Sequence, residues 1–81
     1  NLVLYPNPTN DILNIVIPFN INKKDTFITV YSFLGRPVTT VSLDENSSHI
    51  KLQLHDLASG PYIAKITFSN GEVFTSKFIK K

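Results

Sequence analysis

Two histidines and six carboxylates are the side chains of this 81-residue chain that could support acid–base or metal chemistry. His49 and His55 lie six positions apart, so on one continuous strand they would be about 20 Å apart at ~3.3 Å per residue. Two ligands at that separation cannot hold one metal ion, and the chain has no cysteine to complete a site. We therefore expect both histidines on a solvent-facing surface, and no metal.

The carboxylates fall mostly in segments with turn-forming composition: Asp11, Asp25, Asp44, Glu45, Asp56 and Glu72. A glycosidase needs two carboxylates held across a cleft, whereas Asp side chains in turns usually bond nearby backbone amides. Ser59, His55 and Asp56 can be arranged on paper as a hydrolytic set, but no G-x-S-x-G elbow surrounds the serine. The sequence thus predicts a protein that is not an enzyme and needs no cofactor.

Nine aromatic rings, six Phe and three Tyr, could instead form a stacking platform for carbohydrate. Most of them alternate with polar neighbours as core residues do, and the chain has no Trp. We expect most rings in the core, and Phe33, which precedes Gly35 in a turn, to be exposed. Nucleic-acid binding is disfavoured, because eight basic residues are spread thinly among six acids.

Short apolar runs separated by turn-forming residues predict seven strands and no helix. The runs are Leu2–Tyr5, Ile12–Ile17, Thr26–Ser32, Pro37–Leu43, Ser48–Leu54, Pro61–Ser69 and Glu72–Ile79. Polar loops are expected at 20–25 and 44–48, and Asn70-Gly71 predicts a hairpin with a type I′ turn. Alternation points six side chains into the core: Ile50, Leu52, Leu54, Tyr62, Ala64 and Ile66. The predicted fold is all-β, a seven-stranded antiparallel immunoglobulin-like β-sandwich.

Four motifs, in order along the chain, carry a family resemblance. They are Tyr5-Pro6-Asn7-Pro8 with Asp11-Ile12-Leu13-Asn14-Ile15, then the corner Val30–Val38 that contains Gly35-Arg36, then Leu57-Ala58-Ser59-Gly60-Pro61-Tyr62, and finally Lys77-Phe78-Ile79-Lys80-Lys81. The whole chain resembles the type A C-terminal sorting domain of the type IX secretion system, found on exported proteins of the Bacteroidetes. One departure is Ser32, where the family often has Asp at the corner.

The resemblance implies a secretion and sorting signal that directs a cargo protein across the outer membrane. It implies that the cargo is joined upstream and that the outer-membrane type IX translocon recognises the folded domain in the periplasm. A sortase-like peptidase then usually removes the domain, leaving the cargo secreted or on the cell surface. The residues that carry the implied sorting motif are Tyr5, Pro6, Asn7, Pro8, Gly35, Arg36, Leu57, Gly60, Tyr62, Lys77, Lys80 and Lys81.

Two further expectations follow. Because the chain does not start with Met, residues 1–81 are expected to be a single domain excised from a larger exported protein. Lys80 and Lys81 are expected to bury little surface, so deleting them should leave the fold intact while export falls. The alternative function, from a different class, is an accessory carbohydrate-binding or spacer β-sandwich of an extracellular enzyme.

Overall fold

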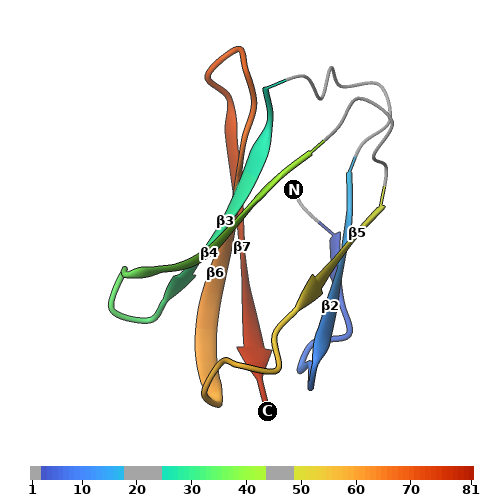
Figure 1. The fold of residues 1–81 in the computed structure, drawn as a ribbon, viewed down its shortest axis with the longest axis vertical. Coiled ribbons are helices and arrows are strands. Elements are labelled where there is room, and N and C mark those ends of the chain that lie inside the picture. The colour runs from blue at the N-terminus through green and yellow to red at the C-terminus, as the bar shows by residue number, and fades with distance from the viewer. Residues whose placement is uncertain (1–2, 18–24, 44–48) are drawn as a thin grey trace.

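The computed structural model describes residues 3–17, 25–43 and 49–81. It is a sandwich of two antiparallel sheets (Figure 1), with no helix among the described residues that is long and apolar enough to cross a membrane. The three-stranded sheet has the order β1 (Val3–Tyr5), β2 (Ile12–Val16), β5 (His49–Gln53). The four-stranded sheet has the order β4 (Pro37–Ser42), β3 (Phe27–Ser32), β6 (Gly60–Thr67), β7 (Val73–Lys80).

This architecture confirms the predicted all-β, seven-stranded immunoglobulin-like sandwich. The predicted runs overlap all seven strands and differ from them by one or two residues at most ends. Two predicted strand ends, Leu2 and Ser48, lie outside the described residues, as do residues 20–24 of the predicted loop 20–25 and the whole of the predicted loop 44–48.

The core lies between the sheets and follows the period-two alternation of the strands. Leu13 pairs with Leu52 across the three-stranded sheet, and both side chains are buried against the facing layer. On the facing layer, β6 buries every second residue from Tyr62 to Phe68. The six side chains predicted to face the core do so, with Ile50 packed at its margin as a partly buried member.

Fewer aromatic rings enter the core than alternation suggested. Tyr62, Phe68 and Phe78 are buried, whereas Tyr5, Phe27 and Phe33 are exposed, and Phe19 lies outside the described residues. The β3 segment has β-branched or aromatic residues on both faces, and its inward positions go to Ile28 and Val30, which leaves Phe27 outside. Strand parity therefore decides where such a ring lies. The prediction that most rings enter the core is wrong for Tyr5 and Phe27, Phe74 packs against the core as a partly buried ring, and the exposure predicted for Phe33 is confirmed.

The hairpin at Asn70-Gly71 forms as predicted, but not through a type I′ turn. A type I′ turn needs positive φ at both central residues, and among the described non-glycine residues only Asp25 has one. The Gly71 amide donates to the Phe68 carbonyl at 3.0 Å, and the Phe68 amide donates to the Glu72 carbonyl at 2.9 Å. This is a three-residue loop that ends in a glycine with φ of 91°, because Asn70 uses its side chain to accept the Glu72 amide instead.

Candidate functional site

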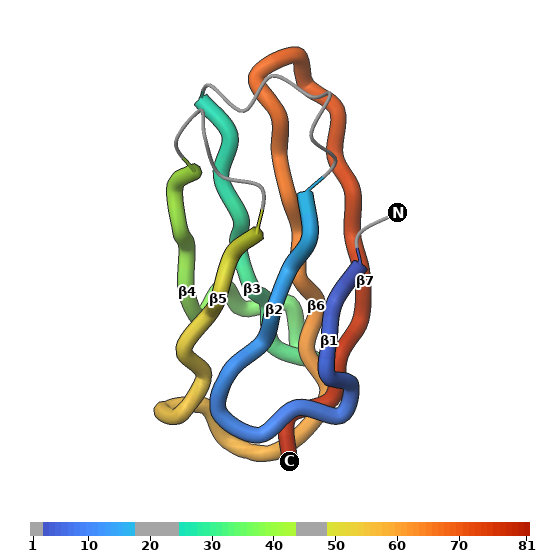
Figure 2. Tube along the Cα trace, turned by 90° about the vertical axis from the view of Figure 1, so that its right-hand side faces the viewer, coloured from blue at the N-terminus to red at the C-terminus, as the bar shows by residue number. Residues whose placement is uncertain are grey.

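The four sequence motifs lie at one end of the sandwich, although they are far apart along the chain. The β1–β2 connection, the β5–β6 connection and the last residues of β7 reach this end, which is at the bottom of Figures 1 and 2, and the β3–β4 hairpin projects sideways just above it. The β6–β7 hairpin lies at the opposite end. We call the lower end the motif end, because it gathers residues from all four motifs.

The first and last motifs are joined directly by hydrogen bonds. The Asn7 side-chain oxygen accepts the backbone amide of Ile79 at 2.9 Å. The Thr9 amide donates to the Ile79 carbonyl, and the Lys81 amide donates to the Thr9 carbonyl, each at 2.8 Å. Thr9 thus forms an isolated parallel bridge with Lys80. We call the contact of residues 7–9 with residues 79–81 the clamp; it ties the β1–β2 connection to the edge of the four-stranded sheet.

Thr9 is the central residue of the clamp, and the sequence analysis did not single it out. Its side chain is 1% exposed, and its hydroxyl donates to the Ile12 carbonyl within the same connection. A threonine after a proline is common in turns, so residue type gave no signal for this role. The contact joins residues about seventy positions apart, and only the tertiary structure reveals it.

The lysines of the last motif are not equivalent. Lys77 and Lys81 are exposed, whereas Lys80 is 7% exposed and its Nζ donates to the Lys81 carbonyl at 3.1 Å. Lys80 also pairs with Gly60 across β6 and β7. The expectation that Lys80 and Lys81 bury little is therefore wrong for Lys80 and correct for Lys81. Strand parity turns Lys80 inward with Phe78, and the backbone bridge to Thr9 lies beside it. A partner protein can therefore reach the exposed side chain of Lys77 but not the buried methylene groups of Lys80.

The third motif anchors the start of β6. The Tyr62 hydroxyl donates to the Ala58 carbonyl at 2.6 Å, and its ring stacks on Phe78 with centroids 5.7 Å apart. A tyrosine near the start of this strand, bonded to backbone a few residues upstream, is typical of immunoglobulin-like sandwiches. Gly60, whose φ of 145° disfavours other residues, begins the strand. Leu57 is half-buried against the core. These motif residues form the base of the motif end.

The second motif forms a projecting hairpin tip. The Gly35 amide donates to the Ser32 carbonyl at 2.9 Å, and Gly35 has a φ of 85°. The Ser32 hydroxyl accepts the Arg36 amide at 3.3 Å, so serine supplies a corner contact at the position where the resembled family often has Asp. The register of β3 with β4 shifts between Val30 and Tyr31 and leaves Val38 as an extra residue on β4, and Figure 1 shows the hairpin projecting out of the sheet.

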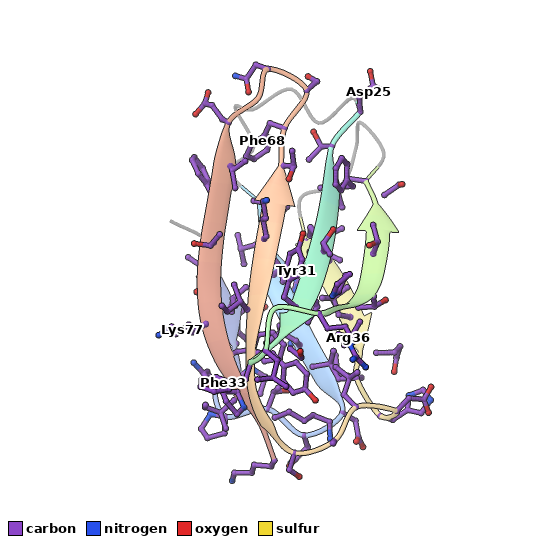
Figure 3. The ribbon with its side chains drawn as sticks, turned by 90° about the vertical axis from the view of Figure 1, so that its left-hand side faces the viewer. Asp25, Tyr31, Phe33, Arg36, Phe68 and Lys77 are labelled. Carbon is purple, nitrogen blue, oxygen red and sulfur yellow. The ribbon has the colours of Figure 1, made fainter. Side chains whose placement is uncertain are left out.

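Beside this tip the surface is hollowed. A cavity of about 180 Å³ is lined by Phe33, Pro61, Tyr62, Ile63 and Lys77. Phe33 and Lys77 lie toward the β7 side of the sheet in Figure 3, whereas Arg36 lies toward β4. The structure thus brings Lys77 and the third motif beside the hairpin, but it places Arg36 away from them.

Tyr5 belongs to a different surface from the rest of its motif. Its hydroxyl lies 3.3 Å from His49 Nε2, and the same nitrogen lies 3.1 Å from Asn14 Oδ1. These three side chains lie in an exposed polar group on the outer face of the three-stranded sheet. Pro6 and Pro8 are exposed in the connection between Tyr5 and the clamp. The first motif therefore contributes residues to two surfaces, the outer face of the three-stranded sheet and the motif end.

Both histidines are solvent-facing, as predicted. His49 contacts Tyr5, and His55 lies 3.4 Å from Asp56 in the β5–β6 connection, with 61% of its side chain exposed. Across residues 3–17, 25–43 and 49–81, no group of three or more His, Asp or Glu side chains could hold a metal ion. The exposed rings of the described residues do not form one platform. Tyr5 is on the three-stranded sheet, whereas Phe27 is the first residue of β3 and Phe33 directly follows its last residue, at the other end of the strand.

Comparison with known families identifies the chain. The model for the secretion system C-terminal sorting domain matches residues 3–81. The chain belongs to this family. As a member it carries a C-terminal sorting signal for type IX secretion, and that role leads to the cell surface or to secretion. The role implies contact with the type IX secretion machinery and attachment to an upstream cargo domain.

The fold itself is shared more widely than the sorting-domain family. The crystal structure of CopC from Methylosinus trichosporium OB3b is similar with a TM-score of 0.55 over 99% of this chain and 91% of that one. The two sequences are 14% identical, so the likeness concerns the fold alone. A search of curated protein sequences gives no match.

Proposed function

We propose that residues 1–81 form one sorting module whose motif end is read by the outer-membrane type IX translocon during passage through the periplasm. The observation that carries the proposal is the gathering of four dispersed motifs at one end, with the first and last joined by the clamp. A partner that touched only this end could contact residues of all four motifs at once. After transport, a sortase-like peptidase would separate the module from its upstream cargo.

Within this proposal the motif residues divide by burial. Tyr62, Leu57 and Lys80 are buried or half-buried, and they support the surface from below. The exposed members, which a partner could touch directly, are Tyr5, Pro6, Asn7, Pro8, Gly35, Arg36, Lys77 and Lys81. Loss of a supporting residue should lower stability and export together. Among the exposed members, loss of the Arg36 or Lys77 side chain, which lies outside the clamp, should lower export alone, whereas loss of the Asn7 side chain also removes its bond to the Ile79 amide.

The test is a fusion of residues 1–81 to an inert exported reporter in a type IX-competent bacterium. We expect the reporter outside the cell or on its surface, and in the periplasm of an isogenic strain that lacks the translocon. A size shift that depends on the peptidase would support cleavage. A reporter that stays in the periplasm of the competent strain would contradict the proposal.

A further inference from the structure

The outer face of the four-stranded sheet carries positive charge without negative charge. Strands β3, β4, β6 and β7, which the structure describes in full, contain no Asp or Glu. Lys65 and Lys77 occupy outward positions, because their neighbours in the strand, Ala64, Ile66 and Phe78, are buried. The Lys65 Nζ lies 5.9 Å from the centroid of the Tyr31 ring on the same face. A face of one sign attracts a partner of the opposite sign.

An apolar hollow lies at the motif end of this face. Phe33, Pro61 and Ile63 line it, Lys77 is part of its wall, and Leu34 extends the apolar surface along the hairpin. Phe33 is 76% exposed and Leu34 is 90% exposed, the two largest exposures among the large hydrophobic side chains described. The volume of about 180 Å³ compares with a cavity of about 150 Å³ that admits benzene. One aliphatic side chain of a partner would therefore fit.

We propose that this surface, which we call the Phe33 patch (Phe33, Leu34, Pro61, Ile63 and Lys77), docks an extended segment of a protein partner that bears acidic and aliphatic residues. An aliphatic side chain enters the hollow while an acidic one pairs with Lys77. The assignment of that segment to the export machinery rests on the proposed sorting function. Charge complementarity with the positively charged face is the reason that we expect acidic residues in the docked segment. The hollow beside Lys77 favours a protruding side chain over the flat surface of a lipid bilayer.

The chemistry of the occupant can be tested on the 81-residue chain alone. Amide shifts would be followed by NMR during titration with a peptide that alternates Leu and Glu, with Leu/Lys and Ser/Glu peptides as controls. We expect saturable shifts only with the Leu/Glu peptide, at residues 32–36, 60, 62, 63 and 77. Lys77→Glu should abolish them, while Lys51→Glu, an exposed lysine on the other sheet, should not.

Three outcomes of the titration would overturn the proposal. They are absence of saturable shifts with the Leu/Glu peptide, equal binding of all three peptides, and shifts centred on the Phe27 end of the sheet. A separate measurement addresses lipid: vesicles of phosphatidylethanolamine and phosphatidylglycerol should not bind. Binding to these vesicles without binding to the Leu/Glu peptide would mean that the patch contacts a membrane, and the proposal would be wrong.

Export of the reporter fusion tests whether the patch serves sorting. Truncating a central contact residue commonly lowers affinity by about tenfold or more, so Phe33→Ser and Lys77→Glu should each lower export to a similar degree. The matched controls are Phe27→Ser, on the same face at its other end, and Lys51→Glu; both should be exported. Urea midpoints of all four purified variants would separate misfolding from lost docking.

The two proposals fail in different ways. Normal export of both Phe33→Ser and Lys77→Glu would remove the patch from sorting, while export of the parent fusion keeps the sorting proposal intact. If the parent fusion is not exported, the sorting proposal fails, and the peptide titration alone then decides whether the patch binds an acidic, aliphatic segment.

Discussion

Replacing Lys80 by Ala tests whether a motif lysine supports the fold instead of meeting a partner. Lys80 is 7% exposed, and its Nζ donates to the Lys81 carbonyl. Truncation to Ala removes three buried methylenes, worth about 2.4 kcal/mol at ~0.8 kcal/mol each, and one hydrogen bond worth about 0.5–1.5 kcal/mol. Release of the ammonium into water offsets part of this loss.

The net cost expected for Lys80→Ala is about 1–3 kcal/mol, against a total of about 4–12 kcal/mol for a domain of this size. Lys77 is exposed on the same strand and is the matched control, so Lys77→Ala should change stability by no more than about 0.5 kcal/mol. Lys80→Met, which keeps the apolar stem, should lie within about 1 kcal/mol of the parent.

Urea unfolding followed by far-UV circular dichroism at 25 °C measures all three variants. Their midpoints can be compared directly if the slopes agree, since the slope reports the surface exposed on unfolding. Deleting Lys80 and Lys81 should cost more than Lys80→Ala, because the deletion also removes the Lys81 amide that donates to Thr9. Equal stability of Lys80→Ala and Lys77→Ala would refute the structural role of Lys80.

Leu52→Ala should lower the free energy of unfolding by about 2–5 kcal/mol, since Leu52 is 3% exposed in the core. Chemical denaturation that showed no loss of stability would contradict the inward orientation of this side chain. Tyr62→Phe should cost about 1 kcal/mol, the net worth of its bond to Ala58, as read from the urea midpoint; an unchanged midpoint would mean that water replaces the bond. Gly71→Ala should cost about 1–2 kcal/mol because its φ is 91°, and a thermal midpoint equal to the parent's would count against this. Calorimetric titration with zinc and with plant and bacterial polysaccharides should show no saturable binding; micromolar affinity for one polysaccharide would favour the accessory-module alternative.

The strands and most of the core could be predicted because period-two alternation is a local property of the sequence. Ile50, Leu52 and Leu54 alternate with polar residues, and only one register places all three inward. Phe27 could not be placed in this way, because β3 has β-branched or aromatic residues on both faces and its composition does not say which face meets the core. The pairing of β3 with β6 decides it by placing Ile28 opposite Ile66.

The residues of the candidate site could be named from sequence, but their contacts could not. The family motifs identified Asn7 and Lys80 without any local signal that the first segment reaches the last strand. The position of the last hairpin could be predicted from Asn70-Gly71, but the type of its turn could not. The side chain of Asn70 accepts the Glu72 amide and so favours a three-residue loop over a two-residue one. Long-range pairing and side-chain capping depend on neighbours that the local pattern does not contain.

The clamp makes the sorting signal depend on the fold, with a consequence for how motif variants are interpreted. Asn7 holds the Ile79 amide, and Thr9 holds both Ile79 and Lys81. A change at either end of the chain therefore disturbs the other, and lost export alone does not separate recognition from stability. Lys77 and Phe33 are exposed and lie outside the clamp. Substitutions at these two positions therefore give the cleaner measure of what a partner touches.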